Sequence, residues 1–143
     1  MKWMFLPYRR YFDFSGRSRR LEYWMFTLMT VIVSILFVVL IIASLPFDEN
    51  WQFSEASPMP GPGFWVGLGG FILFLLGSLI PGIAVTVRRF HDQDLSGWLY
   101  LLNFIPYVGG LVVFVFMCLD GTRGTNRFGP DSKDPLVEAE IFS

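Results

Sequence analysis

Three long apolar blocks constrain this chain more than any other feature of its sequence. They cover residues 24–45, 64–87 and 98–119, and none of them contains a charged residue. A helix needs about 20 apolar residues to cross a hydrocarbon layer roughly 30 Å thick, and each block has that length. Because lipid offers the backbone no hydrogen-bond partner, each block is expected to be helical. The sequence therefore predicts an all-α fold, a small multipass transmembrane helical bundle.

Basic residues are concentrated before the first block. Six of the eleven Lys and Arg residues lie in 1–23, whereas 46–63 contains three acidic residues, four prolines and no basic residue. Segments rich in Lys and Arg normally stay in the cytoplasm. We therefore expect the N-terminus in the cytoplasm and 46–63 on the outer side.

Aromatic residues alternate with the arginines of 1–23, a composition typical of an N-terminal interfacial segment lying at the lipid headgroups. Pro7 and the Ser15–Gly16 pair are expected to break this segment, and Ser18 to cap the helix that follows. Basic and aromatic residues together are also found in nucleic-acid-binding proteins, but a chain inserted in a bilayer makes nucleic acid an unfavoured partner. Anionic lipid headgroups are the expected partners of these arginines.

The third apolar block is broken by Asn103, Pro106, Gly109 and Gly110. It is either one kinked span or a hairpin of two half-length arms. A full crossing would place three basic residues outside, whereas a hairpin would keep all eleven inside, as the positive-inside rule favours. Arms of about eight residues reach only about 12 Å, which counts against the hairpin. We favour the hairpin, and the side of the C-terminus depends on it.

The sequence RRFHDQDLSGW at 88–98 contains His91, the only histidine. A continuing helix would place Arg88 beside Asp92. The favoured interpretation of His91 is an interfacial side chain held by Asp94 or by a backbone carbonyl. A proton-handling role and a metal-ligand role are the alternatives. A metal site needs three or four donors, and there is no second histidine or nearby cysteine, so neither a metal nor a cofactor is predicted.

The single cysteine, Cys118, excludes an internal disulfide. Because it lies inside an apolar block, it is expected to pack against other side chains rather than to take part in chemistry.

The loop DGTRGTNRFGPD at 120–131 follows the third block. Gly121 is expected to end the helix in a left-handed conformation. Gly124 and Gly129, with Arg123 and Arg127, suggest either a phosphate-binding loop or, as we favour, a turn anchored on lipid headgroups. Residues 1–130 are predicted to form one integral membrane domain, and 131–143 a short, acidic, mobile tail.

Three segments together resemble a known family: FSGRSRRLEYW at 14–24, RRFHDQDLSGW at 88–98 and GTRGTNRFG at 121–129. The combination is similar to the bacterial inner-membrane family catalogued as domain of unknown function 805, and the resemblance covers about residues 11–130. It implies a small multipass protein of the bacterial inner membrane. It carries no established activity and no catalytic residues.

A returning third block would bring the arginine-rich segments together on the cytoplasmic side. Nine of the eleven basic residues are arginines, which pair with carboxylates through two parallel hydrogen bonds. We therefore predict a polar cluster that staples the helices together, drawn from Arg17, Arg20, Glu22, Arg88, Arg89, His91, Asp92, Asp94, Asp120, Arg123 and Arg127.

Three functions are compatible with these features. The leading hypothesis is a non-enzymatic module that organises the membrane, binds a partner or senses lipid, since no nucleophile–base pair, metal set or mid-membrane charge is evident. Its partners would be membrane lipids, a second copy of the chain or another membrane protein. The alternative is a subunit of an oligomeric transporter or channel, suggested by the glycine-rich second block and the broken third block. A third hypothesis is a lipid-active enzyme in which Asp92 or Asp94 orients His91 as an acid–base group.

Overall fold

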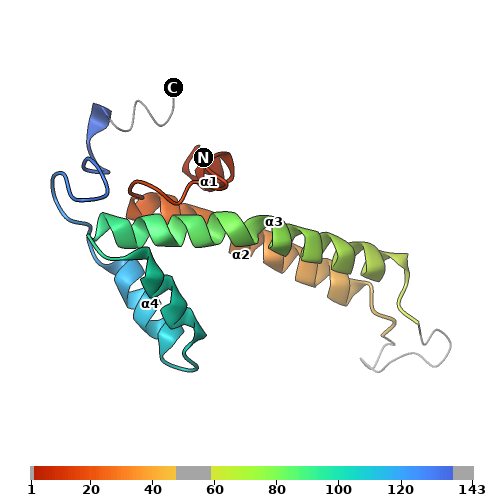
Figure 1. The fold of residues 1–143 in the computed structure, drawn as a ribbon. Coiled ribbons are helices and arrows are strands. Elements are labelled where there is room, and N and C mark those ends of the chain that lie inside the picture. Colours follow the sequence, from red (N-terminus) through yellow and green to blue (C-terminus); the bar gives the residue numbers. More distant parts are fainter. Residues whose placement is uncertain (1, 48–58, 137–143) are drawn as a thin grey trace. The chain divides into compact units, whose positions relative to one another are not determined.

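The computed structural model describes residues 2–47 and 59–136 (Figure 1). These residues form five helices and no β-strand, which confirms the all-α prediction. The helices are α1 Lys2–Arg9, α2 Arg20–Ala43, α3 Pro62–Asp92, the 3-10 helix η1 Gly97–Phe104 and α4 Gly109–Cys118. The greater part of the predicted outer loop, 48–58, and the end of the predicted tail, 137–143, lie outside the described residues.

Two helices are long and apolar enough to cross a membrane: α2 with 24 residues and α3 with 31. At 1.5 Å per residue they measure about 36 and 46 Å, more than the roughly 30 Å of a hydrocarbon core. Helix α3 begins at Pro62, which suits a first helical position because the nitrogen there needs no partner. It continues beyond the apolar block to Asp92, so the motif RRFHD forms its last turns.

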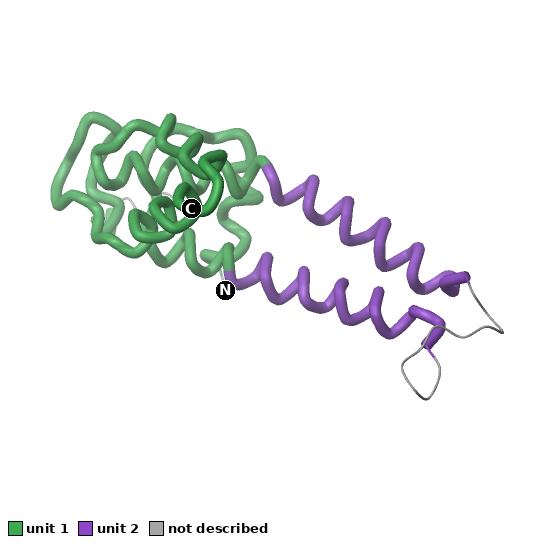
Figure 2. Tube along the Cα trace, turned by 90° about the horizontal axis from the view of Figure 1, so that it is seen from below, with its two compact units in different colours: residues 1–27, 80–143 green, residues 28–79 purple. Residues whose placement is uncertain are grey.

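The chain divides into two compact units (Figure 2). Unit 1 comprises residues 1–27 and 80–143, and unit 2 comprises residues 28–79. Within unit 2, α2 and α3 lie side by side, and glycines allow their close approach. A Cβ atom on Gly70 would lie 2.8 Å from the ring of Phe37, and one on Gly67 would lie 3.1 Å from Ile41. The prediction of a single domain over 1–130 stays a prediction.

The third apolar block forms a hairpin within unit 1. Helices η1 and α4 are its two arms and pack against each other. The turn between them contains Pro106 and Tyr107, whose φ of 64° is left-handed. A Cβ atom on Gly109 would lie 1.7 Å from the carbonyl oxygen of Leu102, so the arms meet at a position that only glycine fits.

The arms of the hairpin are matched in length. Eight residues of 3-10 helix rise about 16 Å, and ten residues of α-helix rise about 15 Å. Each arm therefore reaches about half of a hydrocarbon core. The segments that flank the block meet, since the backbone N–H of Thr122, just after it, donates to the carbonyl of Asp92, just before it, at 2.8 Å.

The core of unit 1 joins the hairpin to α3. Phe90, Val113 and Met117 form a buried cluster, with Trp24 of α2 packed against it. The rings of Trp24 and Phe114 also meet edge to face at 5.6 Å. Burial of these side chains fixes the hairpin against the ends of α2 and α3.

Two predictions for the N-terminal segment are wrong. Pro7 lies inside α1, where it costs one backbone hydrogen bond but does not break the helix. Ser18 does not cap α2, because its Oγ atom is buried without a hydrogen-bond partner. Its backbone N–H instead donates to the carbonyl of Arg88 at 3.1 Å, which draws the chain onto α3 before α2 begins.

Candidate functional site

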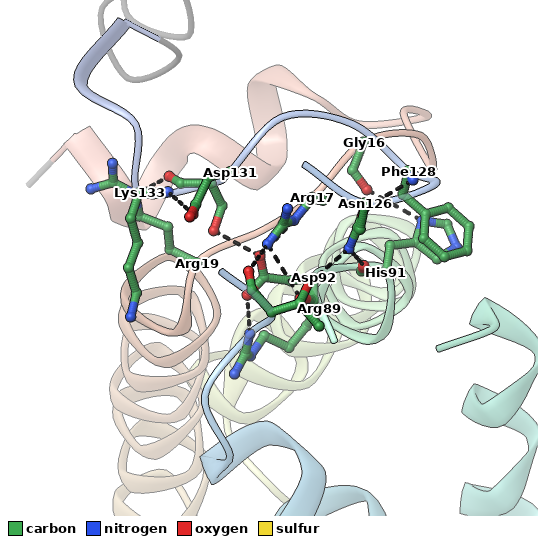
Figure 3. A network of polar contacts seen from close by, with 12 residues as sticks. Gly16, Arg17, Arg19, Arg89, His91, Asp92, Asn126, Phe128, Asp131 and Lys133 are labelled. Carbon is green, nitrogen blue, oxygen red and sulfur yellow. Dashed lines mark hydrogen bonds and ion pairs between the residues drawn. The ribbon is translucent and has the colours of Figure 1, made fainter. Parts of the chain in front are cut away.

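Asp92, the last residue of α3, is the centre of a buried polar cluster (Figure 3). It is 2% exposed. Its carboxylate accepts hydrogen bonds from Arg17 Nε at 2.9 Å and Ser132 Oγ at 2.7 Å, and it forms an ion pair with Arg89. Its carbonyl accepts from the hydroxyl of Thr122 at 3.1 Å as well as from that residue's N–H. Segments far apart in the sequence thus meet on one residue.

The two arginines on Asp92 also hold the segment that leaves the hairpin. Arg17 donates from Nη1 to the carbonyl of Gly124 at 2.6 Å and from Nη2 to that of Thr122 at 2.5 Å. Arg89 donates to the carbonyl of Leu119 just beyond α4. The guanidinium groups therefore connect α3 to 119–124 through backbone contacts as well as through Asp92.

Arg88 forms the second buried ion pair. Its Nη2 atom lies 2.9 Å from Oε1 of Glu22, and neither side chain has appreciable solvent exposure. Arg88 also donates to the backbone carbonyl of Asp13. Because Glu22 lies in the first turn of α2, this pair ties the start of α2 to the end of α3.

Among the described residues, three guanidinium groups and two carboxylates are buried: Arg17, Arg88, Arg89, Glu22 and Asp92. The excess positive charge is compensated by the carbonyl groups that accept from the arginines. Two buried donors, Nε of Arg88 and Nε of Arg89, have no hydrogen-bond partner. Burying charges is costly, so the cluster holds only while every carboxylate keeps its cation.

The predicted pairing of Arg88 with Asp92 is wrong. Asp92 pairs with Arg89, three residues before it, because consecutive helical residues point about 100° apart and Arg88 faces Glu22. The prediction for Gly121 is also wrong, since its φ is not left-handed. A Cβ atom there would lie 1.9 Å from Oδ2 of Asp92, so glycine is needed for space at the cluster.

The remaining acidic members of the predicted cluster lie at its exposed edge. Asp120 pairs with Arg20 at 2.7 Å and with Lys133 at 3.1 Å, and the hydrogen bond from Lys133 lowers the pKa of Asp120. Asp94 pairs with Arg127 at 3.1 Å. These exposed pairs contribute little to stability compared with the buried ones.

The glycine–arginine loop has little room for a phosphate. The backbone N–H of Gly124 donates to Asp131 at 2.8 Å, and the N–H of Lys133 donates to the same carboxylate at 2.9 Å. These two backbone hydrogen bonds lower the pKa of Asp131. Arg123 is exposed and forms no hydrogen bond or ion pair with another described residue, whereas Arg127 pairs with Asp94. Asp131 therefore occupies the place that an anion would take.

His91 lies beside the cluster and takes no part in its ion pairs. Its Nδ1 atom is 3.3 Å from the carbonyl oxygen of Gly16, as the backbone-carbonyl interpretation expected. Its ring stacks on Phe128 with centroids 3.8 Å apart (Figure 3). Neither Asp92 nor Asp94 hydrogen-bonds to it, so the acid–base dyad of the enzyme hypothesis is not formed.

A cationic groove of about 570 Å³ opens at the start of α2. Three cations line it, from Arg19, Arg20 and Lys133, together with the apolar side chains of Leu21 and Trp24 and with Cys118. Cys118 is exposed, so the prediction that it packs is wrong. Arg19 donates to the carbonyl of Ser132, and its guanidinium lies 5.2 Å from the ring centroid of Trp3. Asp120 forms ion pairs with two of these cations, Arg20 and Lys133, so the groove combines charged side chains with an apolar wall.

No three His, Cys, Asp or Glu side chains among residues 2–47 and 59–136 come together as a metal site. Several polar residues of the site escaped the sequence prediction: Asp13, Arg19, Thr122, Asn126, Ser132 and Lys133. Thr122 and Asn126 belong to the motif GTRGTNRFG, which was a signal of their importance. Ser132 and Asp13 carried no such signal. Ser132 acts through a tertiary contact with Asp92, and Asp13 accepts from Arg88 through its backbone carbonyl.

The chain is similar to a known protein family and to curated inner membrane proteins. The family model described as "Protein of unknown function (DUF805)" matches residues 11–130. The chain is 39% identical to inner membrane protein YhaI of Escherichia coli K12 over 134 residues, which cover 93% of the chain and 97% of the relative. It is also 39% identical to inner membrane protein YhaH of the same strain over 133 residues, 93% of the chain and 98% of the relative. No solved structure matches the chain significantly.

Proposed function

Since the chain belongs to the DUF805 family and is an integral protein of the bacterial inner membrane, we propose that it is a non-enzymatic module that recognises anionic lipids of the cytoplasmic leaflet. The buried polar cluster would hold the protein together, and the exposed cations around it would bind the lipid. The observation that carries the proposal is the cationic groove of Arg19, Arg20 and Lys133.

Charge distribution supports the cytoplasmic side. All eleven Lys and Arg residues belong to unit 1, and unit 2 has none. The return of the hairpin to Asp92 leaves α2 and α3 as the two crossings, so the two basic parts of unit 1 would share one side. By the positive-inside rule that side is the cytoplasm, where anionic lipids attract clustered cations.

The composition of the groove supports a lipid with an anionic headgroup. Its three cations can attract a phosphate, and the apolar faces of Leu21 and Trp24 can lie against an acyl chain. Asp120 neutralises part of this charge, because its single carboxylate is shared between Arg20 and Lys133. Such a surface would prefer phosphatidylglycerol over a zwitterionic lipid.

The proposal is tested with purified protein in nanodiscs of phosphatidylcholine, with and without phosphatidylglycerol. We expect phosphatidylglycerol to raise the midpoint of thermal unfolding, and added salt to weaken the effect. The double variant Arg20→Gln/Lys133→Gln should lose most of this rise in the unfolding midpoint. The matched control is Arg9→Gln/Arg123→Gln, which removes two exposed cations outside the groove and should show the same rise as the native protein. An equal gain in both double variants would refute the groove as the lipid site, and no gain in the native protein would refute the proposed function.

A further inference from the structure

A second groove, of about 560 Å³, lies in unit 1 beside His91. We infer that this His91 groove binds an uncharged amphiphile, a molecule with a hydroxyl group at one end of a hydrocarbon chain. Its walls come from the last turns of α3, from the start of the hairpin, and from Phe14 and Phe128. Among the described residues, no Lys, Arg, Asp or Glu side chain lines it. The inference does not depend on the anionic-lipid proposal, which concerns a different set of residues.

The orientation of His91 leaves one nitrogen available to a ligand. Nδ1 faces the carbonyl oxygen of Gly16, which can only accept, so Nδ1 carries the proton. In the neutral ring Nε2 is then an acceptor. Nε2 has no hydrogen-bond partner among the described residues and is not enclosed. Stacking on Phe128 fixes the orientation of the His91 ring. The Phe128 ring is held in turn by the guanidinium of Arg127, which lies 4.8 Å from its centroid and pairs with Asp94.

Glycine at position 97 keeps this nitrogen accessible. A Cβ atom on Gly97 would lie 3.1 Å from Nε2 of His91 and 2.6 Å from Cγ1 of Val87. Ser96, the residue before it, also lines the groove. The Ser96 Oγ accepts from the N–H of Trp98 at 3.4 Å, which leaves its own proton available for donation. The groove thus offers one acceptor, Nε2 of His91, and one donor, the Ser96 hydroxyl, the complement of a hydroxyl group.

The rest of the groove is apolar and runs along α3. Ile83 lies eight residues before His91, about 12 Å along the helix axis, and Leu101 of η1 faces the same groove. A hydrocarbon chain fits such a wall, whereas an ionised headgroup would find no opposite charge there. The groove therefore selects an uncharged hydroxyl compound, such as a long-chain alcohol or a diacylglycerol, over a fatty acid anion.

The test uses the full chain in detergent and a long-chain alcohol that carries a diazirine. After illumination, cross-linked peptides are identified by mass spectrometry. We expect cross-links in the segments containing Ile83 and Leu101, and competition by dodecanol but not by dodecanoate or dodecane. His91→Phe keeps the stacked ring and removes Nε2, and it should weaken dodecanol competition about five- to tenfold.

Two further variants keep the test decisive. Leu101→Trp places a larger side chain in the groove and leaves His91 unchanged, and it should abolish the cross-links even if His91→Phe folds poorly. Leu111→Phe changes an exposed residue of α4 outside the groove and should behave as the native chain. Equal competition by dodecane, native-like binding by a folded His91→Phe, or cross-links spread over all apolar surfaces would overturn the inference.

Discussion

At the residue scale, Asp92 decides whether the buried cluster is stable. Two buried guanidinium groups, from Arg17 and Arg89, share its carboxylate. A guanidinium moved from water to the interior loses several kcal/mol of hydration, which its partners must replace. Loss of one of its charges should therefore lower the free energy of unfolding substantially.

We predict that Asp92→Asn will lower the free energy of unfolding by about 3–5 kcal/mol, because two buried cations lose their carboxylate. Asp94→Asn is the matched control, since it removes an exposed partner of Arg127 and should cost at most about 1 kcal/mol. Thermal unfolding in detergent, together with the amount of protein in the membrane, measures both. Similar losses in the two variants would contradict a structural role for the buried cluster.

At the element scale, the hairpin depends on a close contact between its arms. Pro106 and the left-handed Tyr107 reverse the chain, and the core of Phe90, Val113 and Met117 holds the second arm. Gly109 and Gly110 are consecutive in sequence but stand in different surroundings. Gly109 faces the backbone of Leu102, whereas a Cβ atom on Gly110 would meet nothing within 4 Å.

Alanine at these two positions should have opposite effects. Gly109→Ala would push a methyl group into a backbone carbonyl and is expected to destabilise the protein by about 1–3 kcal/mol. Gly110→Ala fills open space within α4 and should stabilise it by up to about 1 kcal/mol through helix propensity. The midpoints of thermal unfolding compare the two, and a neutral Gly109→Ala would show that the arms do not touch there.

At the scale of the whole molecule, the distribution of charge agrees with the return of the hairpin. Every basic residue belongs to unit 1, and the residues of unit 2 include no cation. If the third block crossed the membrane, Arg123, Arg127 and Lys133 would lie opposite the other eight basic residues. The hydrogen bonds from Arg17 to Gly124 and Thr122 require both basic segments at one end.

We predict a topology with two crossings and both termini in the cytoplasm. In a Cys118→Ser background, single cysteines at Ser15 and Thr125 should react with a membrane-impermeant maleimide only after spheroplasts are opened. A cysteine at Ser54, in the predicted outer loop, should react in intact spheroplasts. Reaction at Thr125→Cys in intact spheroplasts would indicate a third crossing, and reaction at Ser15→Cys would invert the proposed orientation.

The sequence by itself determined the helical class, the membrane location and the type of polar residue that gathers at one end. These follow from chain length, hydropathy and charge, because a bilayer requires about 20 apolar residues for each crossing and excludes unpaired charges. The interruption at Pro106 and Gly109 also pointed to a hairpin, although the full crossing remained open. The motif around Arg88 supplied candidate members of the cluster but not their partners.

Only the tertiary structure decided which charges meet. Local spacing favoured Arg88 with Asp92, yet Arg88 pairs with Glu22 and Asp92 with Arg17 and Arg89. The reason is that sequence spacing describes neighbours on one helix, such as Arg89 and Asp92. The buried pairs Arg17–Asp92 and Arg88–Glu22 instead depend on the packing of segments more than 60 residues apart. For the same reason, the sequence did not show that position 121 must be glycine to leave room for the Asp92 carboxylate. It also did not show that the Ser132 hydroxyl donates a hydrogen bond to Asp92.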